Sequence, residues 1–193
     1  SRAQTSLAIL YTSFERFEEA NLLFSKSLTN KKLIVSDTHP FAAETYYYQA
    51  CLYRDQGQYD LAREKYDLAL NSFHVAYLSS SYWIGRCYVG IGILDDDKGD
   101  EEISLINYAK GIEIYQQYIH KYYLPAADVY MNIGALLTSK QRYTDSMEAY
   151  QSAYTIYYAY FHSHLNHPDL LAAKKGILDL RNKISNNENQ KDD

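Results

Sequence analysis

Three histidines, His162, His164 and His167, come closest to a set of metal ligands by residue type and spacing. On a helix, His162 and His164 would point about 200° apart, and His167 stands directly before Pro168. Three imidazoles could therefore converge on one ion only in a specially shaped loop. The spacing does not favour a metal centre, and we expect none.

The acidic segment 95–102 is similar in composition to a calcium-binding loop. Gly99 falls at a ligand position, Asp100 at the position of the obligatory glycine, and Ile106 where a bidentate glutamate is required. We therefore interpret the segment as a solvated turn, or as a secondary contact for a basic partner.

Motifs that support catalysis are not found in the sequence. It contains no phosphate-binding glycine loop, no nucleophile elbow and no His-Glu-x-x-His motif. Cys51 has no histidine or cationic neighbour in sequence that would activate its thiol. We expect neither an enzyme nor a cofactor.

The charge and apolar patterns exclude two classes of ligand and indicate a compartment. The chain has 193 residues and a formal net charge of −5, without a block of Lys or Arg, which disfavours nucleic acid and anionic membranes. Its longest apolar run, 87–94, is far short of the ~20 residues of a membrane helix. Cys51 and Cys87, 36 residues apart, suit a reduced, cytoplasmic setting. The start at Ser1, directly in a helical pattern, suggests an excised or processed piece.

An internal repeat organises the chain and predicts helices. The scarcity of turn residues, 8 Gly and 3 Pro, also favours helices over a β-sandwich or barrel. Small and large apolar residues of the first copy are Leu7, Ala8, Tyr11, Phe17, Ala20, Phe24 and Leu28. A shift of 42 gives Gln49, Ala50, Tyr53, Tyr59, Ala62, Tyr66 and Leu70. The fourth copy reads Ile133, Gly134, Leu137, Tyr143, Ser146, Tyr150 and Ala153.

The third copy is irregular in this alignment. It shows Ile84, Gly85 and Tyr88 and resumes at Gly99, so the small residue near the middle of each first helix moves from 8 to 50, 85 and 134. We interpret the uneven steps as a seven-residue insertion, in which the acidic run 95–97 lengthens the turn between two helices.

The periodic apolar stripes predict an all-α fold. One helix pair cannot bury its stripe alone, so antiparallel pairs should stack into a right-handed α-solenoid. We expect one domain, 1–184, with about four repeats near 1–36, 40–76, 77–122 and 125–162, a capping helix at 168–184, and a disordered polar tail at 185–193.

The repeat resembles the tetratricopeptide repeat (TPR) family, and its best copy consists of Tyr46, Ala50, Tyr53, Gly57, Tyr59, Ala62, Tyr66, Ala69 and Leu70. The 42-residue spacing and the dipeptides His39-Pro40 and His167-Pro168 are similar to the kinesin light chain subgroup. The third unit lacks this dipeptide, and the fourth is entered through Tyr123-Leu124-Pro125.

One face of the first helices predicts a binding groove, because it carries aromatic and polar residues where a solvated face would be charged. This face includes Ile9, Thr12, Ser13, Cys51 and Asp55. The candidate partner-binding residues are Tyr47, Tyr48, Arg54, Tyr82, Trp83, Arg86, Met131 and Asn132. Tyr48 and Trp83 could instead turn into the core between adjacent repeats.

These residues predict a protein-protein interaction scaffold that holds a peptide segment of a partner. Chaperone-binding TPR grooves carry a Lys/Asn/Arg clamp, whereas this chain has Thr5, Ile9, Tyr47 and Cys51 there. The kinesin light chain resemblance implies an extended peptide whose aromatic or aliphatic anchor is flanked by acidic residues, which Arg54 and Arg86 could pair with.

The 22 tyrosines leave an alternative open. About half fall at repeat positions expected in the core: Tyr11, Tyr46, Tyr53, Tyr59, Tyr66, Tyr88, Tyr108, Tyr130, Tyr143 and Tyr150. The surplus includes Tyr115, Tyr118, Tyr122, Tyr123, Tyr154, Tyr157, Tyr158 and Tyr160. Such a surface could pack permanently into a larger cytoskeletal or motor assembly. The oligomeric state is not predicted.

Overall fold

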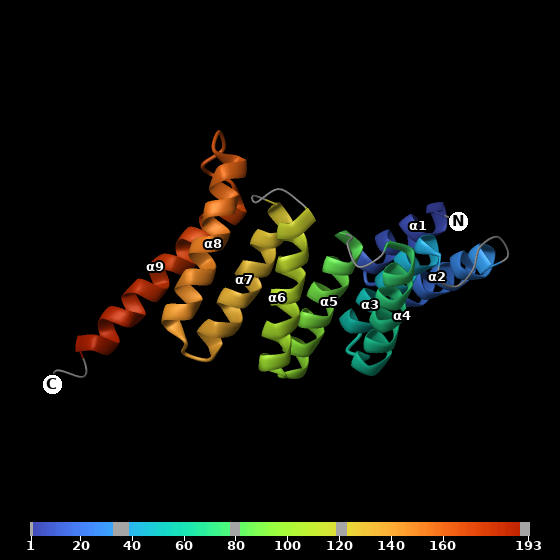
Figure 1. Ribbon diagram of the computed structural model, residues 1–193, viewed down its shortest axis with the longest axis horizontal. Coiled ribbons are helices and arrows are strands. Elements are labelled where there is room, and N and C mark those ends of the chain that lie inside the picture. Colours follow the sequence, from blue (N-terminus) through green and yellow to red (C-terminus); the bar gives the residue numbers. More distant parts are fainter. Residues whose placement is uncertain (1, 33–38, 78–81, 119–122, 190–193) are drawn as a thin grey trace. The chain divides into compact units, whose positions relative to one another are not determined.

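The computed structural model describes residues 2–32, 39–77, 82–118 and 123–189, which form nine α-helices (Figure 1). They are α1 (Arg2–Ser13), α2 (Phe17–Lys32), α3 (Pro40–Asp55), α4 (Tyr59–Tyr77), α5 (Tyr82–Lys98), α6 (Glu101–Tyr118), α7 (Leu124–Ser139), α8 (Tyr143–Phe161) and α9 (Pro168–Asn189). The all-α prediction is confirmed. Among these helices, none is both long and apolar enough to cross a lipid bilayer.

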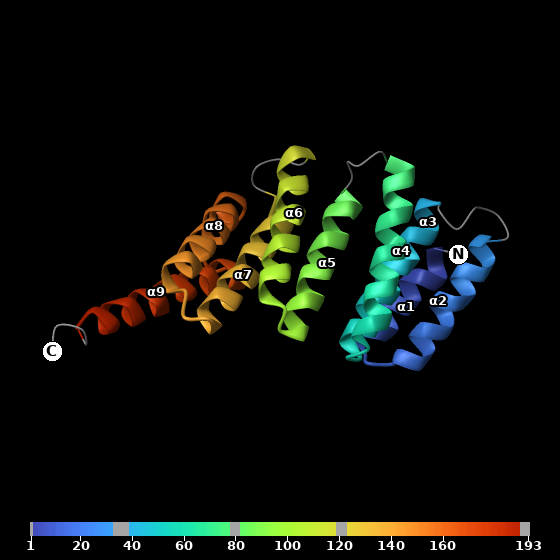
Figure 2. The same cartoon turned by 60° about the horizontal axis from the view of Figure 1, so that its bottom comes forward.

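The chain divides into two compact units, Ser1–Ile114 and Tyr115–Asp193, and each is described by itself. In the first unit α1 packs on α2 and α3 on α4, while α2 also contacts α3 and α4 contacts α5 (Figure 2). In the second unit α8 packs between α7 and α9. The predicted pairing of helices is therefore confirmed.

The turn inside each helix pair is the same structure four times. The second helices start at residues 17, 59, 101 and 143, so each start follows the last by 42 residues. The turn residues with positive φ have the same spacing: Glu15, Gly57, Gly99 and Gln141. In the second pair, Gln58 N donates to Tyr53 O at 2.8 Å and Gly57 N to Arg54 O at 2.8 Å. This is a Schellman motif, which ends a helix with a left-handed residue.

The third repeat contains no insertion, which corrects the sequence alignment. α5 continues through the acidic run 95–97 to Lys98, and the turn lies at Gly99 and Asp100. The residue equivalent to Ala50 and Gly134 is therefore Gly92, not Gly85. These two glycines are seven residues, or about two helical turns, apart, so they share one face of α5 and the apolar pattern alone cannot distinguish them.

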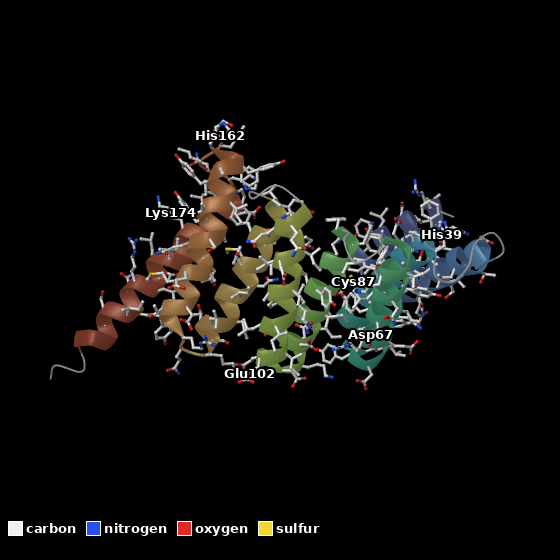
Figure 3. The ribbon with its side chains drawn as sticks, viewed as in Figure 1. His39, Asp67, Cys87, Glu102, His162 and Lys174 are labelled. Carbon is white, nitrogen blue, oxygen red and sulfur yellow. The ribbon has the colours of Figure 1, made fainter. Side chains whose placement is uncertain are left out.

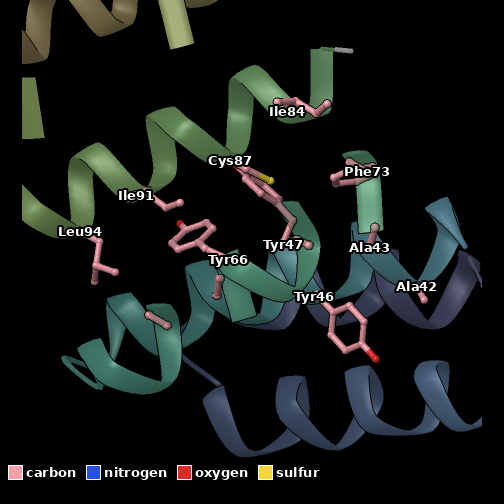
Figure 4. Close-up of a cluster of buried hydrophobic side chains, with 13 residues drawn as sticks. Ala42, Ala43, Tyr46, Tyr47, Tyr66, Phe73, Ile84, Cys87, Ile91 and Leu94 are labelled. Carbon is pink, nitrogen blue, oxygen red and sulfur yellow. The ribbon is translucent and has the colours of Figure 1, made fainter. Parts of the chain in front are cut away.

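Large rings on the second helices meet glycines on the first helices. Tyr66, on α4 and fully buried, touches α5 so closely that a Cβ atom at Gly90 would lie 2.6 Å from its Cε1. Figure 4 shows this ring within the core cluster, beside Ile91. Tyr108 packs against Gly92 in the same way, and Tyr150 against Gly134. The absence of a side chain at these glycines lets the helices approach.

A buried carboxylate joins three helices of the first unit. Asp95 on α5 accepts a hydrogen bond from Asn107 Nδ2 on α6 at 2.8 Å and pairs with Arg63 Nη1 on α4 at 3.2 Å. Burial raises the pKa of the Asp95 carboxyl, although Asn107 and Arg63 act in the opposite direction. The prediction of a solvated turn is wrong for Asp95, because this residue lies inside a helix and its side chain is buried.

The histidine-proline pairs begin two helices. His39 Nδ1 accepts a hydrogen bond from Phe41 N at 3.2 Å at the start of α3, where Figure 3 labels it. His167 Nδ1 accepts one from Asp169 N at 3.4 Å at the start of α9. Proline suits the first turn of a helix, where its missing N–H is not needed.

α9 extends further than expected. It continues to Asn189, so residues 185–189 are helical and not part of a disordered tail. No glycine or proline interrupts the sequence after Gly176, and the polar residues there tolerate helix. Residues 190–193 lie outside the described part of the chain.

Replacing Gly90 by alanine tests the contact with the Tyr66 ring. We expect Gly90→Ala to lower the free energy of unfolding by about 1–3 kcal/mol through overpacking, as measured by urea denaturation. In a Tyr66→Leu background the ring is gone, and alanine should then stabilise α5 by up to ~1 kcal/mol relative to glycine. An equal loss in both backgrounds would contradict this account of the packing.

Replacing Asp95 separates its hydrogen bonds from its charge. Asp95→Ala leaves the buried Asn107 amide without its acceptor and should cost about 1–3 kcal/mol, whereas Asp95→Asn keeps an acceptor and should cost less. Because the raised pKa makes the folded protein favour the protonated carboxyl, wild-type stability from this group falls as pH rises from acid to neutral. The stability of Asp95→Asn relative to wild type should therefore increase over that range. A pH-independent difference would refute the role of burial.

Candidate functional site

A cavity of about 260 Å³ opens on the first unit between α1, α3 and α5, with α2 behind it. This volume is just below the ~300 Å³ at the lower end of small-molecule sites, so the cavity suits one or two side chains of a bound chain. Its lining residues are Ile9, Thr12 and Ser13 of α1, Phe24 of α2, Tyr47, Tyr48, Cys51 and Asp55 of α3, and Arg86 of α5. We call this surface the α1/α3/α5 groove.

The Arg86 guanidinium is surrounded by aromatic rings. Its Cζ lies 4.7 Å from the ring centroid of Tyr47 and 5.1 Å from that of Trp83. The centroids of Tyr48 and Tyr82 are 5.8 and 5.5 Å away, and Arg86 Nη1 donates to the Tyr82 hydroxyl at 3.3 Å. Each ring face attracts the cation, so the four aromatic side chains hold the guanidinium at one end of the cavity.

Arg86 lacks a carboxylate partner among the described residues, although it is half-buried. Tyr47 beneath it is only 8% exposed, and burial raises the pKa of its phenol well above the usual value. The phenol therefore stays neutral and does not balance the positive charge at neutral pH. A half-buried cation that contacts aromatic rings and tyrosine hydroxyls, but no carboxylate of the described residues, can accept a carboxylate from outside.

Arg54, the second predicted cation, is used within the protein. Its Nη2 lies 2.7 Å from Asp55 Oδ1 and its Nε lies 4.0 Å from Asp97 Oδ2 of α5. The acidic residues at the ends of α3 and α5 therefore compete with any ligand for this guanidinium. The sequence interpretation missed this, because it placed Asp97 in a turn and not on α5.

Five of the eight predicted residues gather at the groove: Tyr47, Tyr48, Tyr82, Trp83 and Arg86. Tyr82 is exposed, whereas Tyr48 and Trp83 are half-buried and also pack on the core. Their packing on the core is therefore observed, and their part in partner binding stays a prediction. Met131 and Asn132 are half-buried on α7 in the other unit, and their part in partner binding stays a prediction.

Adjacent residues of α3 serve different surfaces. Figure 4 shows Tyr47 directed toward Cys87 of α5, while Tyr46 points away from that ring. Trp83 extends the aromatic set, since it stacks on Phe73 with centroids 5.4 Å apart and meets Tyr47 edge-on at 5.7 Å. Phe24 is the cavity residue that the sequence pattern did not indicate, because its position on a second helix predicted core only.

The tyrosines of the second unit divide between core and surface. Tyr115 and Tyr157 are buried, and the Tyr157 hydroxyl donates to Asp128 Oδ1 at 2.6 Å. Tyr158 and Tyr160 are exposed near the end of α8. The side chains of Tyr118 and Tyr122 lie outside the described residues. A second contact surface at the exposed pair stays a prediction.

Comparison with known proteins agrees with the repeat. Residues 97–158 match the family model of the tetratricopeptide repeat. No curated protein matches the chain in a sequence search.

Solved structures show where this fold occurs. The nearly identical TPR-like repeats of a kinesin light chain-like protein from Podosopora anserina superpose with a TM-score of 0.76 at 13% identity, over 99% of this chain and 90% of that one. BtubC (BKLC) from P. vanneervenii superposes with a TM-score of 0.72 at 19% identity, over 94% and 80%. At these sequence identities the similarity shows the fold alone. The chain therefore has the fold of the TPR-like solenoids, and residues 97–158 are the part that matches the family model.

Proposed function

We propose that the α1/α3/α5 groove binds an acidic peptide segment of a partner protein, with one carboxylate of the segment paired to Arg86. The observation that carries this proposal is the half-buried guanidinium within four aromatic side chains and without a carboxylate partner in the described residues. TPR folds generally serve protein interaction, and repeat proteins of this kind bind along their concave surfaces.

An apolar side chain of the segment would enter the cavity beside Arg86. Ile9, Phe24 and Tyr47 supply apolar walls there. Asp55, at the other end of the lining, is already paired with Arg54, so the cavity presents one unneutralised positive group. The apolar walls favour an aliphatic or aromatic anchor in the bound segment. The Arg86 charge favours an aspartate or glutamate next to that anchor, through a charge-assisted hydrogen bond.

The accessibility of the Arg86 charge can be measured without a ligand. Trp83 is the only tryptophan, and Arg86 lies 5.1 Å from its ring, so iodide should quench its fluorescence more strongly than caesium does. Arg86→Gln should weaken iodide quenching and leave quenching by neutral acrylamide unchanged. Arg16→Gln is the matched control, because Arg16 is exposed and pairs with Glu19 at 2.6 Å. Unchanged iodide quenching in Arg86→Gln would show that the cation is not accessible from the groove.

Binding is tested with short fluorescein-labelled peptides that carry one leucine between aspartates, and with analogues in which asparagine replaces aspartate. We expect Arg86→Gln to weaken binding of the aspartate peptide by about 10–100-fold, which corresponds to one charged hydrogen bond. Tyr82→Ala should also weaken binding, and Arg16→Gln should leave it unchanged. Affinity should fall as salt is added. Equal affinity of wild type and Arg86→Gln, or of the two peptides, would overturn the proposal.

A further inference from the structure

A second hollow lies in the first unit, between α2 and α4, with α3 as its floor. Its volume is about 740 Å³. The lining residues are Ser25, Leu28 and Thr29 of α2, Tyr46, Gln49 and Tyr53 of α3, and Lys65, Leu68, Asn71, Ser72 and Val75 of α4. We call it the α2/α4 cleft. It shares α3 with the α1/α3/α5 groove, but none of its lining residues.

The floor of the cleft holds an unsatisfied polar group. Gln49 is only 4% exposed, and its Oε1 has no hydrogen-bond partner. The equivalent positions of the other repeats, 42 residues apart, hold Leu7, Ile91 and Ile133. A buried acceptor without a donor destabilises the folded protein, so a glutamine where the other repeats have an aliphatic residue points to a donor supplied from outside.

The α4 wall of the cleft has the pattern of a helix-binding surface. Leu61, Leu68 and Val75 are spaced seven residues apart, and Leu68 and Val75 are 39% and 68% exposed. Apolar residues at this interval form the seam along which a second helix packs. One side of the seam carries three exposed carboxylates, Asp60, Glu64 and Asp67; Figure 3 labels Asp67 on α4. Glu64 Oε1 lies 2.6 Å from Lys65 Nζ and Asp67 Oδ1 lies 3.4 Å from Arg63 Nε. Such exposed ion pairs are weak enough for an incoming cation to share. The surface therefore fits an amphipathic helix with basic residues beside its apolar stripe.

α9 of this chain is such a helix. Its inner face, Leu170, Ala173 and Leu180, is buried, whereas Leu171 and Leu178, seven residues apart, are 45% and 47% exposed. Lys174, Lys175, Arg181 and Asn182 lie along or beside the same outer stripe and are exposed. The apolar spacing of α9 thus matches that of α4, and its charges are opposite.

The outer face of α9 also differs from the first helices of the inner repeats. On the 42-residue period Gly176 of α9 is equivalent to Gly134 of α7, and a Cβ atom at Gly176 would lie 3.0 Å from the Tyr150 ring. Leu171 and Leu178 are then equivalent to Val129 and Leu136, which are only 1% and 5% exposed. A face that α7 buries is therefore uncovered on α9 and is available for another contact.

We propose that α9 of one copy of the protein docks into the α2/α4 cleft of a second copy. Leu171 and Leu178 pack against Leu68 and Val75, and Lys174 and Arg181 lie along the acidic side of α4. Lys175 or Asn182, which share the leucine stripe, donates a hydrogen bond to Gln49 Oε1. Because the two surfaces differ, the contact is heterologous: the copy that supplies α9 keeps a free cleft, and the copy that supplies the cleft keeps a free α9, so further copies can add.

The proposal predicts concentration-dependent association of the full chain, measured by sedimentation velocity. Leu178→Glu places a negative charge opposite the acidic side of α4, and Leu68→Arg places a positive charge opposite α9. Each substitution should lower the association constant at least about tenfold, as expected for a central interface residue. The matched controls are Leu165→Glu and Leu10→Arg, which change leucines exposed elsewhere and should associate like wild type.

Mixing the two variants gives a sharper test. Leu178→Glu retains an intact cleft and Leu68→Arg retains an intact α9, so an equimolar mixture should form a heterodimer that cannot extend, while each variant alone stays monomeric. A wild-type protein that is monomeric at every concentration, or a mixture without heterodimers, would overturn the proposal. So would association that Leu68→Arg abolishes and Leu178→Glu does not, because another surface would then occupy the cleft.

Gln49→Leu distinguishes the hydrogen bond from the shape of the cleft. It restores the aliphatic residue of the other repeats, so we expect a higher melting temperature together with weaker association. A variant that associates as strongly as wild type would refute the role of Gln49 as an acceptor. Peptide binding at Arg86 should be the same in all these variants, since the two surfaces share no lining residue.

Discussion

The distance between paired helices depends on a ring from the second helix that fills the space above a small residue of a first helix. Tyr66 lies against Gly90 of α5, the first helix of the next pair, whereas Tyr108 and Tyr150 lie against Gly92 and Gly134, each on the first helix of the same pair. Behind the last two rings, Ser104 Oγ donates to Gly92 O at 2.8 Å and Ser146 Oγ to Gly134 O at 2.7 Å. Ring, glycine and serine together fix how closely two helices pack, because close-packed interiors admit neither a void nor an extra methyl group.

This packing leaves each first helix with two available sides. On α3, Tyr46 and Tyr47 are neighbours in sequence, yet Tyr46 lines the α2/α4 cleft and Tyr47 the α1/α3/α5 groove. Successive residues of a helix are about 100° apart, so one helix can serve a surface on each side while its small residues face its partner. The positions of both candidate sites therefore follow from the helix pairing.

The sequence predicted the pairing and most of the groove, since both depend on periodicity within single helices. The alignment of the third repeat failed, because seven residues make about two helical turns and return to the same face of a helix. Gly85 and Gly92 are seven residues apart on one face of α5, and only the left-handed turn residue Gly99, 42 after Gly57, fixes the register. The same error placed Asp95 and Asp97 in a turn, which concealed the pairing of Arg63 with Asp95 and of Arg54 with Asp97. Contacts between repeats cannot be read from the period within one repeat.

The two proposed surfaces also differ in how they depart from the repeat. At the position of Arg86 the other copies hold Arg2, Glu44 and Asp128, so every copy carries a charge there and the aromatic residues around Arg86 are what set it apart. At the position of Gln49 the other copies are aliphatic, and the polar group itself is the departure. Stability alone would favour leucine or isoleucine at residue 49, because burial without a donor opposes folding. Residues that oppose folding locally are expected where a protein binds something. Gln49 lies next to Ala50, the small residue at this place in its repeat, and so departs from the repeat without replacing the residue that lets the helices approach.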